Sequence, residues 1–204
     1  NPKEYNGYKV YWNDGGQIVP PHDHAIIEEV RGVAGPHAVK WGKDEDSQSR
    51  IKITDAATDE AYFQTVTDLR MDSDLIENGS NLPIVYTPLH GTGSVSVIPV
   101  LAKAGFRNVH IVESQREPDG NFPTVHSPNP EEGAALSAAI ERAKEVNAQL
   151  VLGTDPDADR VGIAVPDAKT EGGWRLLNGN ETGALLVDYV VNGRAANGTL
   201  QPGY

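Results

Sequence analysis

Between residues 82 and 190 the sequence alternates short apolar runs with longer stretches in which apolar residues recur at helical spacing. Short apolar runs bounded by turn residues are typical of buried strands, whereas a period of about 3.6 residues is typical of amphipathic helices. The pattern predicts strands at residues 82–89, 108–112, 149–153, 161–165 and 174–177. Strands that alternate with helices in this way predict an α/β layer architecture.

Two helices are predicted between these strands. The first follows the glycine-rich turn at residues 91–93 and ends at Gly105. The second occupies residues 130–148 and has apolar residues along one face. Its first turn is expected to contain Glu131 and Glu132, because the dipole of a helix favours acidic side chains at its N-terminus.

A third helix is predicted after the last strand. Residues 178–181 have the pattern of a capping box, in which the first and last residues satisfy each other's backbone amides. The apolar residues that follow predict a helix that extends to Tyr189. From Asn192 onward the chain is glycine-rich and aperiodic, and we expect an irregular tail.

The first part of the chain has a different pattern. Residues 13–16, Asn-Asp-Gly-Gly, separate two short alternating segments and predict a β-hairpin with a type I′ turn. Helical spacing then predicts a helix around residues 26–33. Residues 40–50 are charged and aperiodic, which favours a linker or an exposed loop. Thr58 is expected to cap a further helix that carries apolar residues as far as Leu69.

Charge and composition narrow the possible functions. The chain has 17 basic and 29 acidic residues, and its formal net charge of −12 disfavours binding to nucleic acids or to anionic membranes. It has no cysteine, which excludes disulfides and thiolate catalysis. No apolar run approaches the roughly 18 residues of a membrane span, so we expect a cytoplasmic protein. Because the chain begins at Asn1 rather than at Met, we also expect a processed product or a piece of a longer protein.

The strongest candidate for chemistry is the segment at residues 155–160, Asp-Pro-Asp-Ala-Asp-Arg, which we call the aspartate loop. Asp155, Asp157 and Asp159 occupy alternate positions between two predicted strands, so their carboxylates are expected to converge on one side. A hard divalent cation would relieve the repulsion between them. Arg160 would either neutralise these carboxylates or contact a phosphate delivered to the metal.

The aspartate loop has three other interpretations. An EF-hand is excluded, because Arg160 and Pro166 occupy the positions where that loop needs a glycine and a bidentate glutamate. The aspartyl-phosphate loop of haloacid-dehalogenase-like phosphatases also places Asp-x-Asp after a strand. That loop, however, has Thr or Val at the position of Asp159 and lies near the start of its domain. On composition alone, a solvated acidic turn without a metal stays open as an alternative.

Six motifs, in order along nearly the whole chain, resemble those of the α-D-phosphohexomutase superfamily, the phosphoglucomutases and phosphomannomutases. The resemblance implies a three-layer α/β/α sandwich, which is the second domain of these enzymes, preceded by a hairpin and a helix from the end of the first domain. It implies domain boundaries at residues 1–50, 51–177 and 178–204, the last segment being the start of a third domain. The motifs lie at residues 1–9, 15–18, 86–91, 118–123, 128–131 and 155–160.

The resemblance also implies an activity. Enzymes of this superfamily are isomerases that move a phosphoryl group between the 1-position and a distal hydroxyl of a sugar, through a phosphoserine and a sugar bisphosphate. It implies that Asp155, Asp157 and Asp159 are ligands of Mg²⁺ and that Arg160 contacts the phosphoryl group. Lys9 matches the lysine thought to transfer protons near the nucleophile. The expected partner is a phosphosugar, either a glucose, a mannose or a pentose phosphate.

One part of the family pattern lies outside this sequence. In the family the phosphorylated serine belongs to a Ser-His-Asn-Pro loop, and the chain begins at Asn1 and Pro2. We therefore expect these 204 residues to be inactive alone and to bind Mg²⁺ weakly. We also expect aspartates that, instead of converging, are splayed apart or partly neutralised by Arg160. The alternative function is a non-catalytic α/β binding or interaction module with the same fold. The sequence does not indicate the oligomeric state.

Several other polar residues have no assigned role at this point. The turn at residues 90–94 resembles a phosphate-binding loop but matches neither the dinucleotide nor the P-loop pattern, so a strand-to-helix turn is expected, and the role of His90 stays open. Glu113 and Glu117 follow a predicted strand, where open α/β sheets place their ligands. The remaining histidines are expected to be surface or packing residues; these are His22, His24, His37, His110 and His126.

Overall fold

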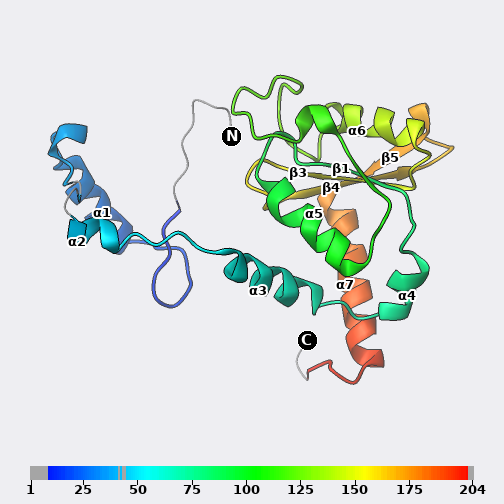
Figure 1. Cartoon of the computed structure of the whole chain (residues 1–204), viewed down its shortest axis with the longest axis horizontal. Coiled ribbons are helices and arrows are strands. Elements are labelled where there is room, and N and C mark those ends of the chain that lie inside the picture. Colours follow the sequence, from blue (N-terminus) through cyan, green and yellow to red (C-terminus); the bar gives the residue numbers. More distant parts are fainter. Residues whose placement is uncertain (1–8, 41, 43–44, 202–204) are drawn as a thin grey trace. The chain divides into compact units, whose positions relative to one another are not determined.

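The computed structural model describes residues 9–40, 42 and 45–201. The chain divides into two compact units, residues 1–55 and residues 56–204. Each unit is described by itself, and Figure 1 shows the elements of both. The aspartate loop lies in the second unit and Lys9 in the first.

The first unit begins with the predicted hairpin. Its two arms are joined by a single antiparallel bridge between Tyr11 and Gln17, so the two expected strands do not form. The predicted type I′ turn is wrong: it needs positive φ at both central residues, whereas only Gly15 (φ 81°) has positive φ within residues 13–16. The amide of Gly15 donates to the carbonyl of Trp12 (3.1 Å), as in a type I turn followed by a left-handed glycine.

The rest of the first unit is helical. Helix α1 (His22–Arg31) confirms the predicted helix and ends at Gly32, and the ring of Trp12 stacks on that of His22 with centroids 4.9 Å apart. A short 3-10 helix, η1, follows at Pro36–Ala38. The expected loop at residues 40–50 contains a further helix, α2 (Glu45–Ser49). Arg50, directly after this helix, forms an i,i+4 ion pair with Asp46 (2.8 Å).

The second unit contains the α/β fold that the alternating pattern predicts. All five predicted strands are present, and β1 and β2 are shorter than expected. The strands are β1 (Ile84–Thr87), β2 (Val109–Ile111), β3 (Leu150–Thr154), β4 (Val161–Pro166) and β5 (Trp174–Leu177). The helices are α3 (Ala56–Thr67), α4 (Ser73–Asn78), α5 (Gly93–Ala104), α6 (Gly133–Glu145) and α7 (Gly179–Ala196), with 3-10 helices η2 (Glu113–Gln115) and η3 (Glu171–Gly173).

Several helix boundaries differ from the prediction. Helix α3 begins at Ala56, so Thr58 lies inside it and does not cap it, and Leu69 lies beyond its end. Helix α6 begins at Gly133, which places Glu131 and Glu132 before its first turn instead of within it. The capping box between Asn178 and Glu181 is confirmed, but α7 continues to Ala196 through the segment expected to be irregular. Helix α4, capped by Asp72, had no predicted counterpart.

The five strands form one mixed sheet in the order β2-β1-β3-β4-β5. Strands β2 and β3 pair with β1 in parallel, with Ile84 opposite Val109 on one side and Leu150 on the other. Strands β4 and β5 continue the sheet antiparallel, β3 being joined to β4 by the aspartate loop. The carboxyl ends of β1, β2 and β3 therefore lie at one edge of the sheet.

Helices cover both faces of this sheet. Helix α6 packs on β1 and β3 from one side, while α5 and α7 lie on the opposite side (Figure 1). The core beneath α6 is built from Leu136, Ala139 and Ala143 of the helix against Val85 and Val151 of the sheet, all fully buried. This arrangement confirms the expected α/β fold with helices on either side of a sheet.

We expect Leu136 to be one of the largest single contributors to this core. Truncating a buried leucine removes its transfer free energy and leaves a cavity, so Leu136→Ala should lower the free energy of unfolding by about 2–5 kcal/mol. Urea denaturation followed by circular dichroism measures this change. The same truncation at Leu75, which is 60% exposed on α4, is the matched control and should cost no more than about 0.5 kcal/mol. Equal costs at the two positions would contradict the assignment of the core.

Candidate metal site at the carboxyl edge of the sheet

The aspartate loop begins directly after β3, at the point where the connections of the sheet change direction. From β1 the chain passes through α5 to β2 on one side, and then returns through α6 to β3 on the other side of β1. The loops after β1 and β3 are therefore neighbours at this edge, and the chain leaves β1 toward β2 but leaves β3 toward β4 on the other side. Open α/β sheets bind their ligands outside the carboxyl ends of strands at such a switch point.

The three aspartates of the loop converge. One carboxylate oxygen from each of Asp155, Asp157 and Asp159 lies within 4.8 Å of the other two, although Asp155 is buried and the others are exposed. The backbone makes this possible through a tight turn, in which the amide of Ala158 (φ 59°) donates to the carbonyl of Asp155 (2.9 Å). The convergence that the spacing predicts is present, and the expectation that the carboxylates would be splayed apart in this chain is wrong, because the tight turn keeps them together.

Arg160 holds the buried aspartate from two directions. Its backbone amide donates to Oδ1 of Asp155 (2.9 Å) and its Nε donates to Oδ2 (2.8 Å). Nε also lies 3.8 Å from Oδ1 of Asp159. The predicted partial neutralisation by Arg160 is therefore present, and a charge-assisted pair of this kind is among the stronger hydrogen-bonded contacts in proteins.

These contacts set the protonation of both partners. Burial by itself raises the pKa of Asp155, but hydrogen bonds from the amide and guanidinium of Arg160 and a bond with Asp157 outweigh burial, so the pKa falls below its ordinary value. The hydrogen bond to Asp155 raises the pKa of Arg160. Asp155 is therefore charged at neutral pH. The Arg160 side chain is 49% exposed, so its guanidinium is also accessible to a ligand.

The aspartate loop is docked on the loop that follows β1. The amide of Thr92 donates to the carbonyl of Pro156 (2.9 Å), and the Thr92 hydroxyl donates to the same oxygen (3.1 Å). A Cβ on Gly91 would lie 2.3 Å from Cα of Pro156, so a larger residue would separate the two loops. At Gly93 a Cβ would lie 2.4 Å from Oγ1 of Thr154, the last residue of β3. Glycine is thus required where α5 begins.

The loops after β1 and β2 are joined around His90, whose side chain is buried. Nε2 of His90 lies 2.8 Å from Oγ1 of Thr124, which also accepts a hydrogen bond from Gln115 (2.9 Å). The Thr87 hydroxyl donates to Gln115 (2.6 Å), which completes a polar network at the end of β1. The structure supports the expected strand-to-helix turn and gives His90 a structural role.

Sequence analysis did not identify Thr87, Gln115 and Thr124 as members of this network. These residues are separated in sequence and share no short motif, so no local signal marks them. Only the structure shows that Gln115 is fully buried and therefore needs hydrogen-bond partners.

Other predicted residues lie outside this network. Glu113 and Glu117 are exposed, and Glu113 pairs with Arg116 (3.3 Å). Lys9 is exposed in the first unit, and its assigned role stays a prediction. None of the five remaining histidines is buried, which agrees with the expected surface or packing positions.

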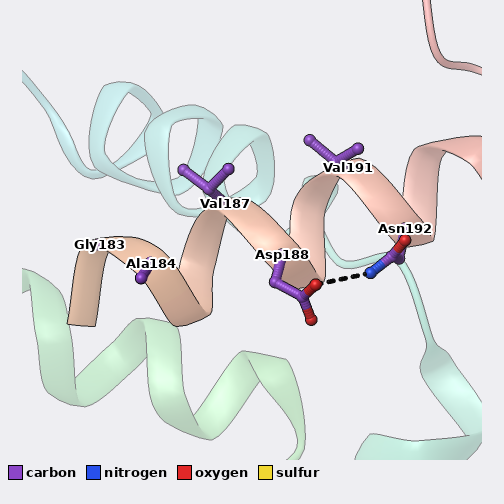
Figure 2. Close-up of a pocket in the computed structure, with 6 residues that line it drawn as sticks. All are labelled: Gly183, Ala184, Val187, Asp188, Val191 and Asn192. Carbon is purple, nitrogen blue, oxygen red and sulfur yellow. Dashed lines mark hydrogen bonds between the residues drawn. The ribbon is translucent and has the colours of Figure 1, made fainter. Parts of the chain in front are cut away.

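A separate hollow lies on α7. It has a volume of about 480 Å³ and is lined by one face of the helix, including Ala184, Val187 and Val191 (Figure 2). Asp188 and Asn192 border it and are hydrogen-bonded to each other (2.9 Å). Its lining includes no residue of the aspartate loop.

Among the described residues, no helix is long and apolar enough to cross a membrane.

The fold and the site together define a class of protein: an α/β domain that presents clustered carboxylates and an arginine at the switch point of its sheet. Residues 60–171 match the family model described as phosphoglucomutase/phosphomannomutase, alpha/beta/alpha domain II. Residues 1–34 match the model of alpha/beta/alpha domain I of the same family. The chain belongs to the phosphoglucomutase/phosphomannomutase family, as its motifs predict.

Relatives with curated names agree with this membership. A probable phosphomannomutase of Haemophilus influenzae is 42% identical over 94% of this chain and 38% of its own length. A phosphoglucomutase of Staphylococcus epidermidis is 41% identical over 94% of this chain and 34% of its own length. A mouse phosphopentomutase is 36% identical over 91% of this chain and 30% of its own length. The chain thus spans about a third of each of these proteins.

A solved structure supports the fold. The crystal structure titled putative phosphomannomutase from Thermus thermophilus aligns with 78% of this chain and 32% of its own, with a TM-score of 0.56 and 23% identity. The predicted domain boundaries at residues 50 and 177 are not tested by these comparisons and stay predictions.

The lowered pKa of Asp155 predicts how stability depends on pH. A carboxylate whose pKa is lower in the folded state stabilises the fold at pH values above its unfolded pKa, about 3.9, and this contribution is lost as pH falls through the folded pKa. In metal-free buffer, Asp155→Asn should lower the free energy of unfolding by about 1–2 kcal/mol at pH 7. The difference from wild type should shrink as the pH falls below 4.

Denaturant titrations at pH 7, 5 and 3 measure this difference. The matched control is Asp74→Asn, which removes an exposed carboxylate from α4. Its effect should be small at each pH. A difference between wild type and Asp155→Asn that stays constant down to pH 3 would contradict the lowered pKa.

Proposed function

We propose that this chain is part of a Mg²⁺-dependent sugar-phosphate mutase, which transfers a phosphoryl group between C1 and a distal hydroxyl of a phosphosugar through a phosphoserine. The observation that carries the proposal is the convergence of three carboxylates beside Arg160 at the switch point of the sheet. Family membership and relatives named as mutases support it. A sugar bisphosphate is the proposed intermediate and activator.

The donor set of the aspartate loop fits the proposed metal. Carboxylate oxygens are the ligands that Mg²⁺ prefers, and the three groups lie close enough to face one ion. Asp155, Asp157 and Asp159 would hold it. When bound, the metal supplies positive charge that stabilises the oxygens of a phosphoryl group during transfer.

Two cationic residues have proposed roles in this reaction. Arg160 is anchored through Nε to Asp155, and its guanidinium is half-exposed, so it can donate to phosphoryl oxygens while remaining oriented. Lys9 is proposed to transfer protons to and from the hydroxyl groups of the sugar. Phosphoryl transfer depends mainly on positioning and on electrostatic stabilisation, and these groups would provide both.

The proposal assigns the phosphorylated serine to sequence that precedes Asn1 in a longer, full-length enzyme. The 204 residues by themselves are then expected to lack turnover and to bind Mg²⁺ weakly, because three carboxylates on a loop would lack the ligand that a serine phosphate provides. Relatives are named for mannose, glucose and pentose phosphates. We therefore propose a phosphosugar as the substrate class and assign no particular sugar.

The first functional prediction concerns Asp157. In the full-length mutase, Asp157→Asn removes the charge of one exposed carboxylate of the proposed metal site and leaves both members of the Asp155–Arg160 pair in place. Turnover should fall by about 100-fold or more, while the melting temperature should change little. A coupled assay that converts glucose 1-phosphate to glucose 6-phosphate, with bisphosphate activator present, measures turnover.

Differential scanning fluorimetry on the same preparation measures stability. Asp74→Asn again serves as the control for loss of one exposed carboxylate, and it should retain wild-type turnover. Activity near the wild-type level in Asp157→Asn would remove this residue from the proposed ligand set.

The second functional prediction concerns Lys9. If Lys9 transfers protons, Lys9→Ala should lower turnover of the full-length enzyme by about 10²- to 10⁴-fold and leave the dependence on Mg²⁺ unchanged. Initial rates measured across a Mg²⁺ titration separate the two effects. Lys40→Ala, at another described lysine of the first unit, is the control. A raised Mg²⁺ requirement with little loss of maximal rate would show that the assigned role is wrong.

A further inference from the structure

The peptide unit that follows Pro156 is held from outside the aspartate loop. Its carbonyl oxygen accepts two hydrogen bonds from a single residue, the backbone amide of Thr92 at 2.9 Å and the Thr92 hydroxyl at 3.1 Å. This carbonyl lies between Asp155 and Asp157 in the chain. Fixing it therefore fixes the path of the backbone between the buried carboxylate and the first exposed one.

The Thr92 hydroxyl is not used as a helix cap. Thr92 is the N-cap residue of α5, where a threonine side chain normally accepts a hydrogen bond from an amide of the first turn. Here no such bond forms, and the backbone of Thr92 is in the right-handed helical region (φ −81°, ψ −10°) instead of the extended region. The side chain is free of the capping task, and its hydroxyl contacts the aspartate loop.

The backbone that precedes Thr92, at Leu89 and His90, is constrained. Leu89 (φ 47°) and His90 (φ 59°) have consecutive positive φ values, which L-residues adopt at a cost. The cost is offset by bonds on both sides of His90, whose amide donates to the carbonyl of Gln115 (2.9 Å) and whose carbonyl accepts from Asp119 (3.0 Å). The position of Thr92 is therefore set by the loop after β2 as well as by β1.

The loop that Thr92 contacts contains like charges that lie close together. Three carboxylates with oxygens within 4.8 Å of one another repel each other, and Arg160 compensates mainly the charge of Asp155. Asp157 and Asp159 are exposed, so the backbone of the loop largely determines where their carboxylates lie. A backbone fixed at the carbonyl of Pro156 limits how far these carboxylates can move.

From these contacts we propose that Thr92 is a positioning residue, which keeps Asp157 close to Asp155 and so preorganises the aspartate loop for a divalent cation. The metal-binding part of this inference rests on the proposed function. The mechanical part, that the Thr92 hydroxyl restrains the loop, does not depend on it.

The test compares three variants of the 204-residue chain. Thr92→Val keeps the shape of the side chain and removes the hydroxyl, Thr92→Ser keeps the hydroxyl and removes the methyl group, and Thr65→Val is the control. Thr65 is an exposed residue on α3 whose hydroxyl bonds only within its own helix. Circular dichroism melts identify any variant that fails to fold.

Two readouts are measured on each variant. Nitrogen-15 relaxation of the amides of Asp157, Ala158 and Asp159 reports loop motion, and Mn²⁺ titration followed by electron paramagnetic resonance reports cation binding. Thr92→Val should increase fast motion of these amides and weaken Mn²⁺ binding by roughly threefold to tenfold, the loss expected for one hydrogen bond. Thr92→Ser and Thr65→Val should match wild type in both measurements.

In the full-length mutase the same variants separate positioning from catalysis. Thr92→Val should raise the Mg²⁺ concentration needed for half-maximal rate, and saturating Mg²⁺ should restore the maximal rate. Thr92→Ser should need no extra Mg²⁺. Unchanged loop relaxation in Thr92→Val, or an equal defect in Thr92→Ser, would overturn the proposal. A further variant, Asp157→Asn, tests the proposed metal site separately. If it bound Mn²⁺ as tightly as wild type, the proposed metal site would be overturned, and the relaxation data would still decide the role of Thr92.

Discussion

The buried carboxylate of Asp155 is the constraint on which the rest of the site depends. A charged group at the end of a buried strand is stable only if its charge is compensated and its oxygens are hydrogen-bonded. Arg160 meets both requirements: its backbone amide donates a hydrogen bond to one oxygen of Asp155, and its charged guanidinium donates to the other. The loop must therefore return within five residues to place Arg160 beside Asp155, and this return brings Asp157 and Asp159 to the same side.

The sheet supplies the rigid frame for this turn. Strands β3 and β4 are antiparallel neighbours, with Thr154 opposite Val161, so the aspartate loop is also the connection between two strands of the central sheet. The Tyr86 hydroxyl bonds to Oγ1 of Thr154 (2.8 Å) and ties β1 to the start of the loop. The first exposed carboxylate thus lies only three residues from a fully hydrogen-bonded strand, which limits how far it can move.

The loops at the carboxyl ends of β1, β2 and β3 form one connected structure. Thr92 joins the first loop to the third, and His90 joins the first to the second. Because the first loop is held by both of the others, the strained backbone at Leu89 and His90 can be maintained. For a mutase this connection would be useful, because phosphoryl transfer requires charges that are already in place before the substrate arrives.

The sequence by itself predicted the strands, the main helices, the family and the aspartate loop, because each depends on local periodicity or on a contiguous motif. It did not predict the turn type at Gly15, the starts of α3 and α6, or the full length of α7, where local signals were ambiguous. Only the tertiary structure decided which residues support the loop. Thr92 and Pro156 are 64 positions apart, and His90 and Thr124 are 34 apart. Contacts of this kind are set by the order and direction of strands, and the spacing of residues along a single chain carries no record of them.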